Sequence, residues 1–111
     1  MRTKFTFPKE VLSRYMAGQR DFRNLNLSGA NLRNLNLSGA NFRGTNFSKV
    51  NLTGANLSYA DLTDAVMVGA NLTNANLTRA NLTNVDLSDV DLSSTILRGT
   101  TLENSSPVVE D

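Results

Sequence analysis

Residues 69–82 read GANLTNANLTRANL, and the same five-residue unit continues on both sides of this stretch. Every fifth position from 22 to 102 holds a large apolar residue, in an unbroken ladder of 17 positions that we call the centres. Thirteen centres are Leu, and the others are Phe22, Phe42, Phe47 and Met67. A period of five fits neither an α-helix of 3.6 residues per turn nor a strand that alternates every two residues. Both regular elements are therefore excluded as the main fold.

The positions around each centre also form columns. The residue two before the centre is Ala in eight repeats, and the residue directly before it is Asn in ten and Asp in four. The pattern predicts a short extended step whose small residue, Asn and centre point in, out and in, followed by two corner residues. Gly or Asn at the second corner residue, as at Gly54 and Asn34, suits backbone with positive φ. The chain is thus expected to coil around a continuous apolar core.

The stretches GANLRNLNLSGANF (29–42) and GANLTNANLTRANL resemble the pentapeptide-repeat family, whose pattern is A-(D/N)-L-x-x, and the match covers residues 21–102. The resemblance implies an all-β solenoid, a right-handed quadrilateral β-helix with 20 residues per coil and about four coils. We divide the chain into an N-terminal segment with a capping helix (1–19), the repeat β-helix (20–104) and a polar C-terminal tail (105–111).

Residues 6–18, TFPKEVLSRYMAG, predict a short helix that starts near Thr6, has Pro8 in its first turn and ends before Gly18. Its apolar residues are expected on one face: Val11, Leu12, Tyr15 and Met16. Because a bare solenoid end exposes apolar side chains and unpaired backbone, we interpret the helix as a cap over the first coil. The alternative is a membrane-surface or partner-binding helix. The phrase LSRYMAGQRDF is also similar to the lead-in of cyanobacterial members.

The other end of the ladder is less regular, since Ile96, Thr100 and Thr101 break the pattern before the tail ENSSPVVED. Either the tail folds over the last coil, or two chains stack end to end through Leu97 and Leu102. The protein is therefore predicted to be a monomer or an end-to-end homodimer.

Composition argues against an enzyme. The chain has no His and no Cys, so the commonest general base and thiolate chemistry are missing, and the repeated walls are convex. No cofactor is predicted. Asp86, Asp89 and Asp91, or Asp61 with Asp64, could gather oxygen ligands for a hard cation, but they lack a calcium-loop spacing and fit solvated positions of the Asn/Asp column. The absence of a long apolar run or signal-peptide pattern predicts a cytoplasmic protein.

The net charge of +1 gives no reason to expect binding to nucleic acid or to a membrane. We expect a structural or protein-interaction module with an unidentified protein partner. The alternative, implied by quinolone-resistance members of the family, is a DNA mimic that inhibits a type II topoisomerase, DNA gyrase. A DNA mimic needs sustained negative charge. The early Arg23 and Arg43 and the shortage of Asp in the Asn/Asp column favour the first hypothesis, with basic residues near the helix and acidic ones toward the C-terminus.

The clearest departure from the pattern is AVMVG at 65–69. Val66 and Val68 take outward positions on either side of the inward Met67, which predicts an exposed apolar pair. It is either drift on a tolerant surface or a contact patch for a protein partner. Tyr59 and Arg79, 20 residues apart at one corner, could stack as a cation–π pair, which we interpret as local stabilisation; the alternative is that they belong to the contact patch.

Overall fold

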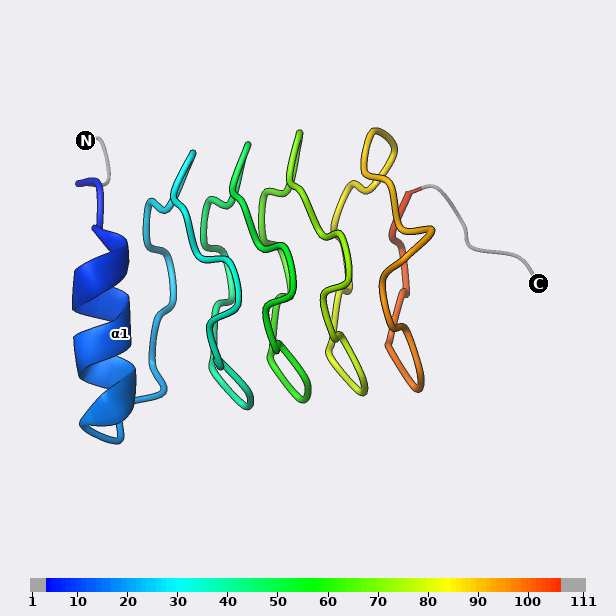
Figure 1. Cartoon of the computed structure of the whole chain (residues 1–111). Coiled ribbons are helices and arrows are strands. Elements are labelled where there is room, and N and C mark those ends of the chain that lie inside the picture. Colours follow the sequence, from blue (N-terminus) through cyan, green and yellow to red (C-terminus); the bar gives the residue numbers. More distant parts are fainter. Residues whose placement is uncertain (1–3, 107–111) are drawn as a thin grey trace.

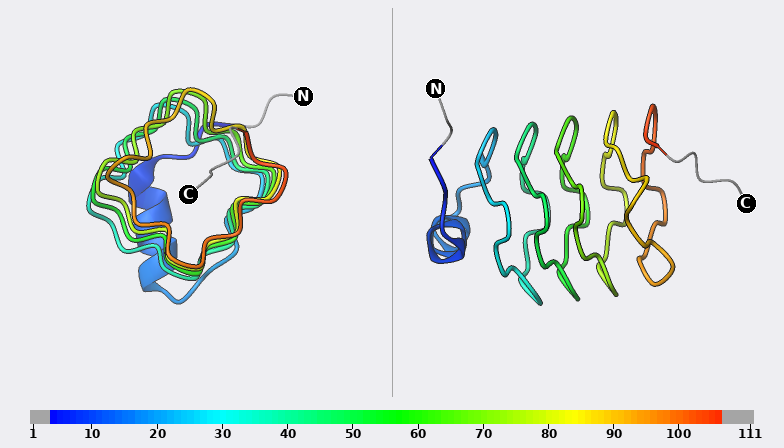
Figure 2. Two further views of the ribbon diagram at one scale, coloured as in Figure 1. Left: turned by 90° about the vertical axis from the view of Figure 1, so that its right-hand side faces the viewer. Right: turned by 90° about the horizontal axis from the view of Figure 1, so that it is seen from above.

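A computed structural model describes residues 4–106 as one helix, α1 (Pro8–Met16), followed by a coiled chain (Figure 1). Parallel bridges of single residues join positions 20 apart, from Asp21–Asn41 to Asp86–Ser106. One coil therefore contains four repeats, and its outline seen along the axis has four sides (Figure 2). Within the described residues the extended steps remain single bridges, because a corner interrupts the pairing in every repeat.

The core consists of the two columns that the sequence assigns to it. Centres from Phe22 to Leu87 are buried almost completely, and the Ala residues beside them are buried as well. Phe22 stacks on Phe42 with ring centroids 5.3 Å apart, and Phe42 meets Phe47 edge to face at 5.0 Å. Each large centre contributes about 1.5 to 3 kcal/mol through burial, before the loss of conformational entropy. The apolar ladder thus holds successive coils together.

The Asn/Asp column has a structural function that the sequence analysis did not identify. In all ten Asn and all four Asp residues, the side-chain Oδ1 accepts a hydrogen bond from the backbone N–H two residues later. These bonds fix the start of each corner, as in an Asx turn. Because Asn and Asp both supply this oxygen, either residue fits the column.

We expect Asn56→Ala to lower the free energy of unfolding by about 1 kcal/mol, because the Ser58 N–H loses its 3.0 Å bond to Asn56 Oδ1. Asn56→Asp keeps an acceptor in the same place and is expected to retain most of the stability. Urea unfolding followed by circular dichroism measures both. Equal losses in the two variants would show that the turn bond does not explain the column.

The predicted helix is confirmed as α1, with Pro8 in its first turn and its end before Gly18, but its N-cap is not Thr6. The residue before α1 is Phe7, which makes no side-chain capping bond, whereas Thr6 is buried and its N–H donates to the Asn26 carbonyl at 2.8 Å. Phe5 forms a bridge with Asn26. Thr6 is therefore not a helix cap, because the ladder of the first coil takes up its backbone.

α1 lies across the end of the first coil (Figures 1 and 2). Val11 is fully buried there, and the Tyr15 hydroxyl donates to the Ser38 carbonyl at 2.7 Å. Val11 and Tyr15 are four residues apart and therefore share a stripe of the helix. The prediction that Leu12 and Met16 lie on the buried face is wrong: both are exposed, Met16 at 78%. They lie about 100° further around the helix and miss the coil.

At the other end the coil continues past the predicted boundary at residue 104. Ser105 is buried and its hydroxyl donates to the Leu82 carbonyl at 2.6 Å, while Ser106 forms a bridge with Asp86. The remainder of the predicted tail, 107–111, lies outside the described residues. Among residues 4–106 there is no helix long and apolar enough to cross a membrane.

Candidate interaction surface

Val66 and Val68 lie side by side on the third coil and are 45% and 47% exposed, while Met67 between them points into the core. Val66 stands in the Asn/Asp column but has no oxygen to accept a hydrogen bond. The Val68 N–H therefore lacks the turn bond that the other members of this column provide. The valine pair thus replaces a local stabilising contact by exposed apolar surface.

Between the coil that carries Val66 and Val68 and the next coil along the chain, the ladder of backbone hydrogen bonds is interrupted. On the same two sides one coil earlier, Phe47 N–H donates to the Val66 carbonyl at 2.7 Å and Leu52 N–H to the Asn71 carbonyl at 2.8 Å. The corresponding N–H groups of Met67 and Leu72 have no hydrogen-bond partner within residues 4–106. Figure 1 shows the last coil leaving the regular spacing in this region.

The interruption covers two sides of one coil. The reciprocal bonds, from the Asp86 and Asp91 N–H groups to the coil below, are also missing between these described residues. The ladder resumes with the Asn76–Ile96 bridge and the 2.8 Å bond from Leu77 N–H to the Ile96 carbonyl. In the described chain the last coil is therefore attached to the rest of the rod by backbone hydrogen bonds on its other two sides only.

Two corners of the next coil also differ from the others. The second corner residue has a φ between 56° and 74° in the other repeats, but not at Asp89 or Ser94. A corner without positive φ turns its central peptide, so the carbonyl that normally accepts from the coil below points away. Side chains take its place: the Gly69 N–H lies 3.2 Å from Asp89 Oδ2, and the Asn74 N–H donates to Ser94 Oγ at 3.2 Å.

The four residues of the predicted contact patch are not brought together. Tyr59 is 62% exposed at a corner, and one whole repeat, 60–64, separates this corner from Val66. The predicted cation–π stack of Tyr59 and Arg79 is wrong, since Arg79 runs over Gly99 in the next coil. The cation–π contacts of the described chain involve other residues: Arg14 with Phe22, and Arg20 with Tyr15. The surface that remains is Val66 and Val68 beside the interrupted ladder.

Leu97 and Leu102, predicted to form an end-to-end contact, lie in the last coil and are half-buried. The same columns are fully buried in the coils below, as at Leu77 and Leu82. Leu97 and Leu102 are partly exposed because no further coil of the described chain covers them.

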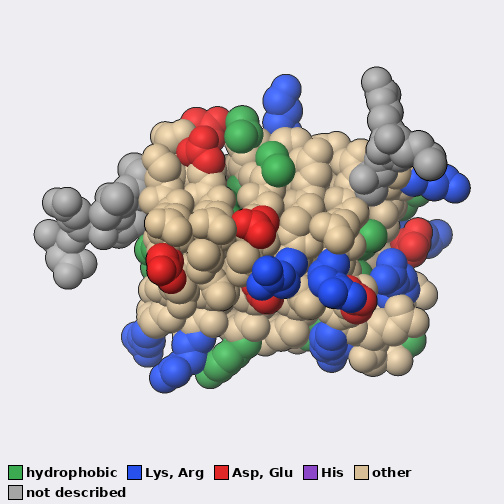
Figure 3. All heavy atoms as spheres, turned by 180° about the vertical axis from the view of Figure 1, so that it is seen from behind, with side chains coloured by type: hydrophobic (Ala, Val, Ile, Leu, Met, Phe, Trp, Pro, Cys, Tyr) green, Lys and Arg blue, Asp and Glu red, His purple; other side chains and the backbone are tan. Residues whose placement is uncertain are grey.

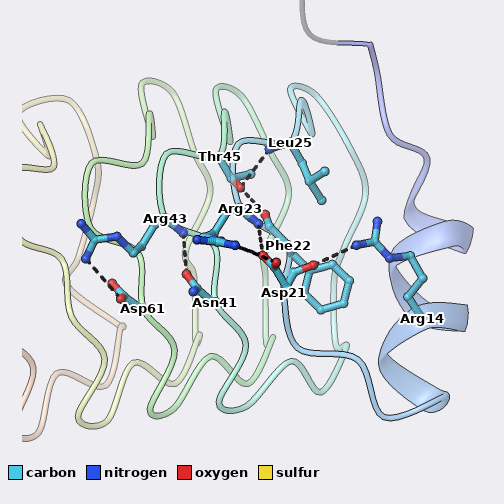
Figure 4. Close-up of polar contacts among 9 residues, drawn as sticks. All are labelled: Arg14, Asp21, Phe22, Arg23, Leu25, Asn41, Arg43, Thr45 and Asp61. Carbon is cyan, nitrogen blue, oxygen red and sulfur yellow. Dashed lines mark hydrogen bonds and ion pairs between the residues drawn. The ribbon is translucent and has the colours of Figure 1, made fainter.

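Basic and acidic side chains lie close together on another wall of the rod (Figure 3). Figure 4 shows how they pair: Arg23 binds Asp21 through two bonds of 2.9 and 3.0 Å, and Arg43 lies 3.5 Å from Asp61. Arg14 of α1 donates to the Asp21 carbonyl at 2.8 Å. The carboxylates on this wall are therefore neutralised by arginines, as expected for a structural ion-pair wall.

These contacts shift the pKa values of the carboxylates. Hydrogen bonds from Arg23 lower the pKa of Asp21 to about 2. At Asp61, partial burial raises the pKa, but bonds from Thr63 and the nearby Arg43 outweigh it, so the net shift is downward. Hydrogen bonds from Ser88 and Ser93 lower the pKa values of Asp86 and Asp91. No group of three acidic residues in 4–106 is arranged to hold a metal ion.

A comparison with profiles of protein families matches residues 21–58 and 55–93 to pentapeptide repeats, in eight copies. The chain belongs to the pentapeptide repeat family. A comparison with curated proteins finds no match. The bridges at a spacing of 20 agree with the right-handed quadrilateral β-helix that pentapeptide repeat proteins form.

Three solved structures show how this pentapeptide repeat protein relates to others. A protein from the thylakoid lumen of Arabidopsis thaliana is 27% identical to this chain, with a TM-score of 0.74. The match covers 81% of this chain and 63% of the Arabidopsis protein. Thus this chain spans less than two thirds of that relative. The protein alr5209 from Nostoc PCC 7120 is 26% identical with a TM-score of 0.54, covering 97% and 93%. QnrB1, a plasmid-mediated fluoroquinolone resistance protein, is 24% identical with a TM-score of 0.55, covering 82% and 52%, and shows the fold alone.

The lowered carboxylate pKa values predict a loss of stability in acid. Each ionised carboxylate stabilises the folded state above the ordinary Asp pKa, about 4, and this contribution disappears as the pH falls through the lowered pKa. Without His, stability is expected to stay nearly constant from about pH 8 to 5 and to fall between about pH 4 and 2. Thermal unfolding across this range is the measurement.

Asp21→Asn is the control, since Asn keeps the turn acceptor of Asp21 but cannot titrate. This variant is expected to lose less stability between pH 4 and 2 than the parent. A midpoint that already falls between pH 7 and 5 would contradict the assignment to carboxylates.

Proposed function

We propose that this pentapeptide repeat protein is a non-enzymatic protein-interaction module whose partner contacts the third coil at Val66 and Val68. The observation that supports the proposal is the coincidence of two departures from the repeat at one place. An exposed apolar pair adjoins a stretch where four backbone N–H groups, those of Met67, Leu72, Asp86 and Asp91, lack partners in the described chain. A protein partner that covers this place removes apolar surface from water and approaches an unpaired strand edge.

The chemistry of the side chains supports a role without catalysis. Many of the Ser and Thr hydroxyls that could suggest nucleophiles have structural partners. Thr73 and Thr78 donate to the preceding Asn side chains at 2.7 and 2.6 Å, and Thr95 donates to the Leu72 carbonyl at 2.9 Å. The sequence supplies neither His nor Cys to activate them.

Gyrase inhibition by DNA mimicry is the alternative, and the ion pairs argue against it. Asp21 and Asp61 face arginines, so this wall does not present the row of unpaired negative charges that a duplex has. The protein is expected to leave DNA supercoiling by gyrase unchanged. Inhibition at a stoichiometric amount of protein would reverse this ranking.

The patch is tested by Val66→Asn with Val68→Ser in one variant, used as bait in the native cell. The Val66→Asn change restores the turn acceptor that the other repeats possess, so the variant is expected to be at least as stable as the parent. The matched control is Ile96→Asn, which replaces another exposed apolar residue of the same column on a different side.

We expect proteins that the parent and the Ile96→Asn control retain in equal amounts, and that the double variant loses by about tenfold or more, corresponding to about 1.4 kcal/mol. Quantitative mass spectrometry of the captured proteins measures this, and binding of the purified pair completes the test. Identical recovery by all three baits would refute the patch.

The cytoplasm is the location that we propose. Cell fractionation with an antibody against the protein is expected to find it with cytoplasmic markers. Recovery with a lumenal fraction, the location of the Arabidopsis relative, would overturn this part of the proposal.

A further inference from the structure

The near-neutral net charge conceals a strong separation along the rod. Residues 1–55 contain nine basic and two acidic residues, whereas residues 56–111 contain two basic and eight acidic residues. On the face in Figure 3, more Lys and Arg side chains lie toward the helix end of the molecule than at the opposite end, where a smaller group is visible. The two ends of the described rod therefore carry opposite charge.

The helix end offers basic and apolar groups to solvent. Its acidic residues are already paired, since Glu10 lies 3.5 Å from Arg14 and Asp21 binds Arg23. Lys4 and Lys9 are exposed and form no ion pair within the described residues. On the same helix, Leu12 and Met16 are the apolar residues of α1 that miss the first coil.

The last coil offers the complementary groups. Four acidic residues lie in 86–106 against a single basic one, Arg98. Its last three centres, Leu92, Leu97 and Leu102, are only half-buried, and the N–H groups of Leu97 and Leu102 have no partner in the described chain. Among residues 4–106, this end combines negative charge with apolar surface and an unpaired strand edge, the arrangement through which chains add to one another.

We propose that copies of this protein associate head to tail, with the helix end of one copy against the last coil of the next. Like ends repel one another, so a dimer joined through two last coils at Leu97 and Leu102 would place acidic surfaces together. A contact between unlike ends is heterologous and leaves a free end of each kind, so short chains of copies grow instead of a closed dimer. This surface uses other side chains than the Val66 and Val68 patch, and Asp86 lies one coil beyond Val66.

Salt controls the association, because the attraction acts between exposed charges. The Debye length is about 30 Å at 0.01 M salt and about 3 Å at 1 M. In light scattering or sedimentation, the mean mass is expected to rise with protein concentration at about 0.01 M salt and to return toward the monomer as salt approaches 1 M. A monomeric mass at every concentration in low salt would overturn the proposal.

Two variants identify the ends in contact. The helix-end variant carries Lys4→Glu and Lys9→Glu. The coil-end variant carries Asp86→Asn, Asp91→Asn and Glu103→Lys. Both Asp→Asn changes keep the oxygen that accepts the turn hydrogen bond. Each variant alone is expected to self-associate at least about tenfold more weakly than the parent. An equimolar mixture is expected to form a 1:1 complex, because one variant retains its acidic coil and the other its basic helix end.

A dimer through two last coils predicts the opposite pattern: the helix-end variant would associate like the parent, and mixing would add no complex. Either of those results would overturn head-to-tail association. Circular dichroism checks that both variants fold, and the salt dependence of the parent tests the proposal without any substitution. Failure here leaves the valine-patch experiment unaffected, since it uses other residues and another readout.

Discussion

Replacing Phe42 by Ala is expected to lower the free energy of unfolding by about 3 to 5 kcal/mol. Phe42 is fully buried and contacts both Phe22, at 5.3 Å between centroids, and Phe47, at 5.0 Å. Its removal leaves a cavity at a place where two coils meet, and the backbone ladder on both sides limits how far the coils can collapse into it. Chemical denaturation followed by circular dichroism measures the loss.

Leu97→Ala is the control for position in the rod. Leu97 occupies the same column of centres but is half-buried in the last coil, so truncation removes less buried surface and leaves no closed cavity. We expect a loss of about 1 kcal/mol. Comparable losses at the two sites would contradict a core that is dense in the middle coils and open at the last one.

Thr45→Val is expected to cost about 2 kcal/mol although the two side chains have nearly the same shape. Thr45 is fully buried among the small residues of the core, and its hydroxyl connects two backbone groups (Figure 4). It donates to the Phe22 carbonyl at 2.6 Å and accepts from the Leu25 N–H at 3.3 Å. Val fills the space but leaves both groups without this partner. Thermal or urea unfolding provides the measurement.

Thr100→Val is the control, because it makes the same substitution at a Thr whose hydroxyl does not bridge two backbone groups. Thr100 also donates to a centre carbonyl, that of Leu77 at 2.6 Å, but this carbonyl already accepts from the Ala80 N–H at 2.9 Å. The substitution therefore removes a second bond instead of the sole partner, and we expect less than half of the loss at Thr45. A larger loss of stability at Thr100 would show that the two hydrogen bonds of the Thr45 hydroxyl do not explain the effect of Thr45→Val.

The core could be predicted because the five-residue period leaves one geometric solution for the apolar columns. Centres and Ala residues must share the inside of a coil, and their burial follows wherever another coil lies above and below. Burial is harder to predict from the sequence at the two ends of the rod. Leu12 and Met16 have the same apolar character as Val11 and Tyr15, and only the position of the first coil decides which pair is buried.

The candidate surface could be predicted only in part. The exposed valines follow from their places in the repeat, but their neighbourhood depends on the conformation of two corners. Lys49, Tyr59 and Arg79 accept positive φ at such corners, while Asp89 and Ser94, which are no less suited to it, do not. Residue type alone therefore does not reveal where the ladder opens. The signal available in the sequence is Asp and Ser, whose side chains compete for backbone hydrogen bonds, at two successive corners.

The interrupted ladder beside Val66 and Val68 is the feature on which the candidate surface depends, and amide hydrogen exchange followed by NMR tests it residue by residue. Met67 and Leu72 are predicted to exchange about a hundredfold faster, or more, than Phe47 and Leu52, which occupy the same columns one coil earlier and are hydrogen-bonded. Equal protection of all four amides would show that the ladder is continuous and would contradict the candidate surface.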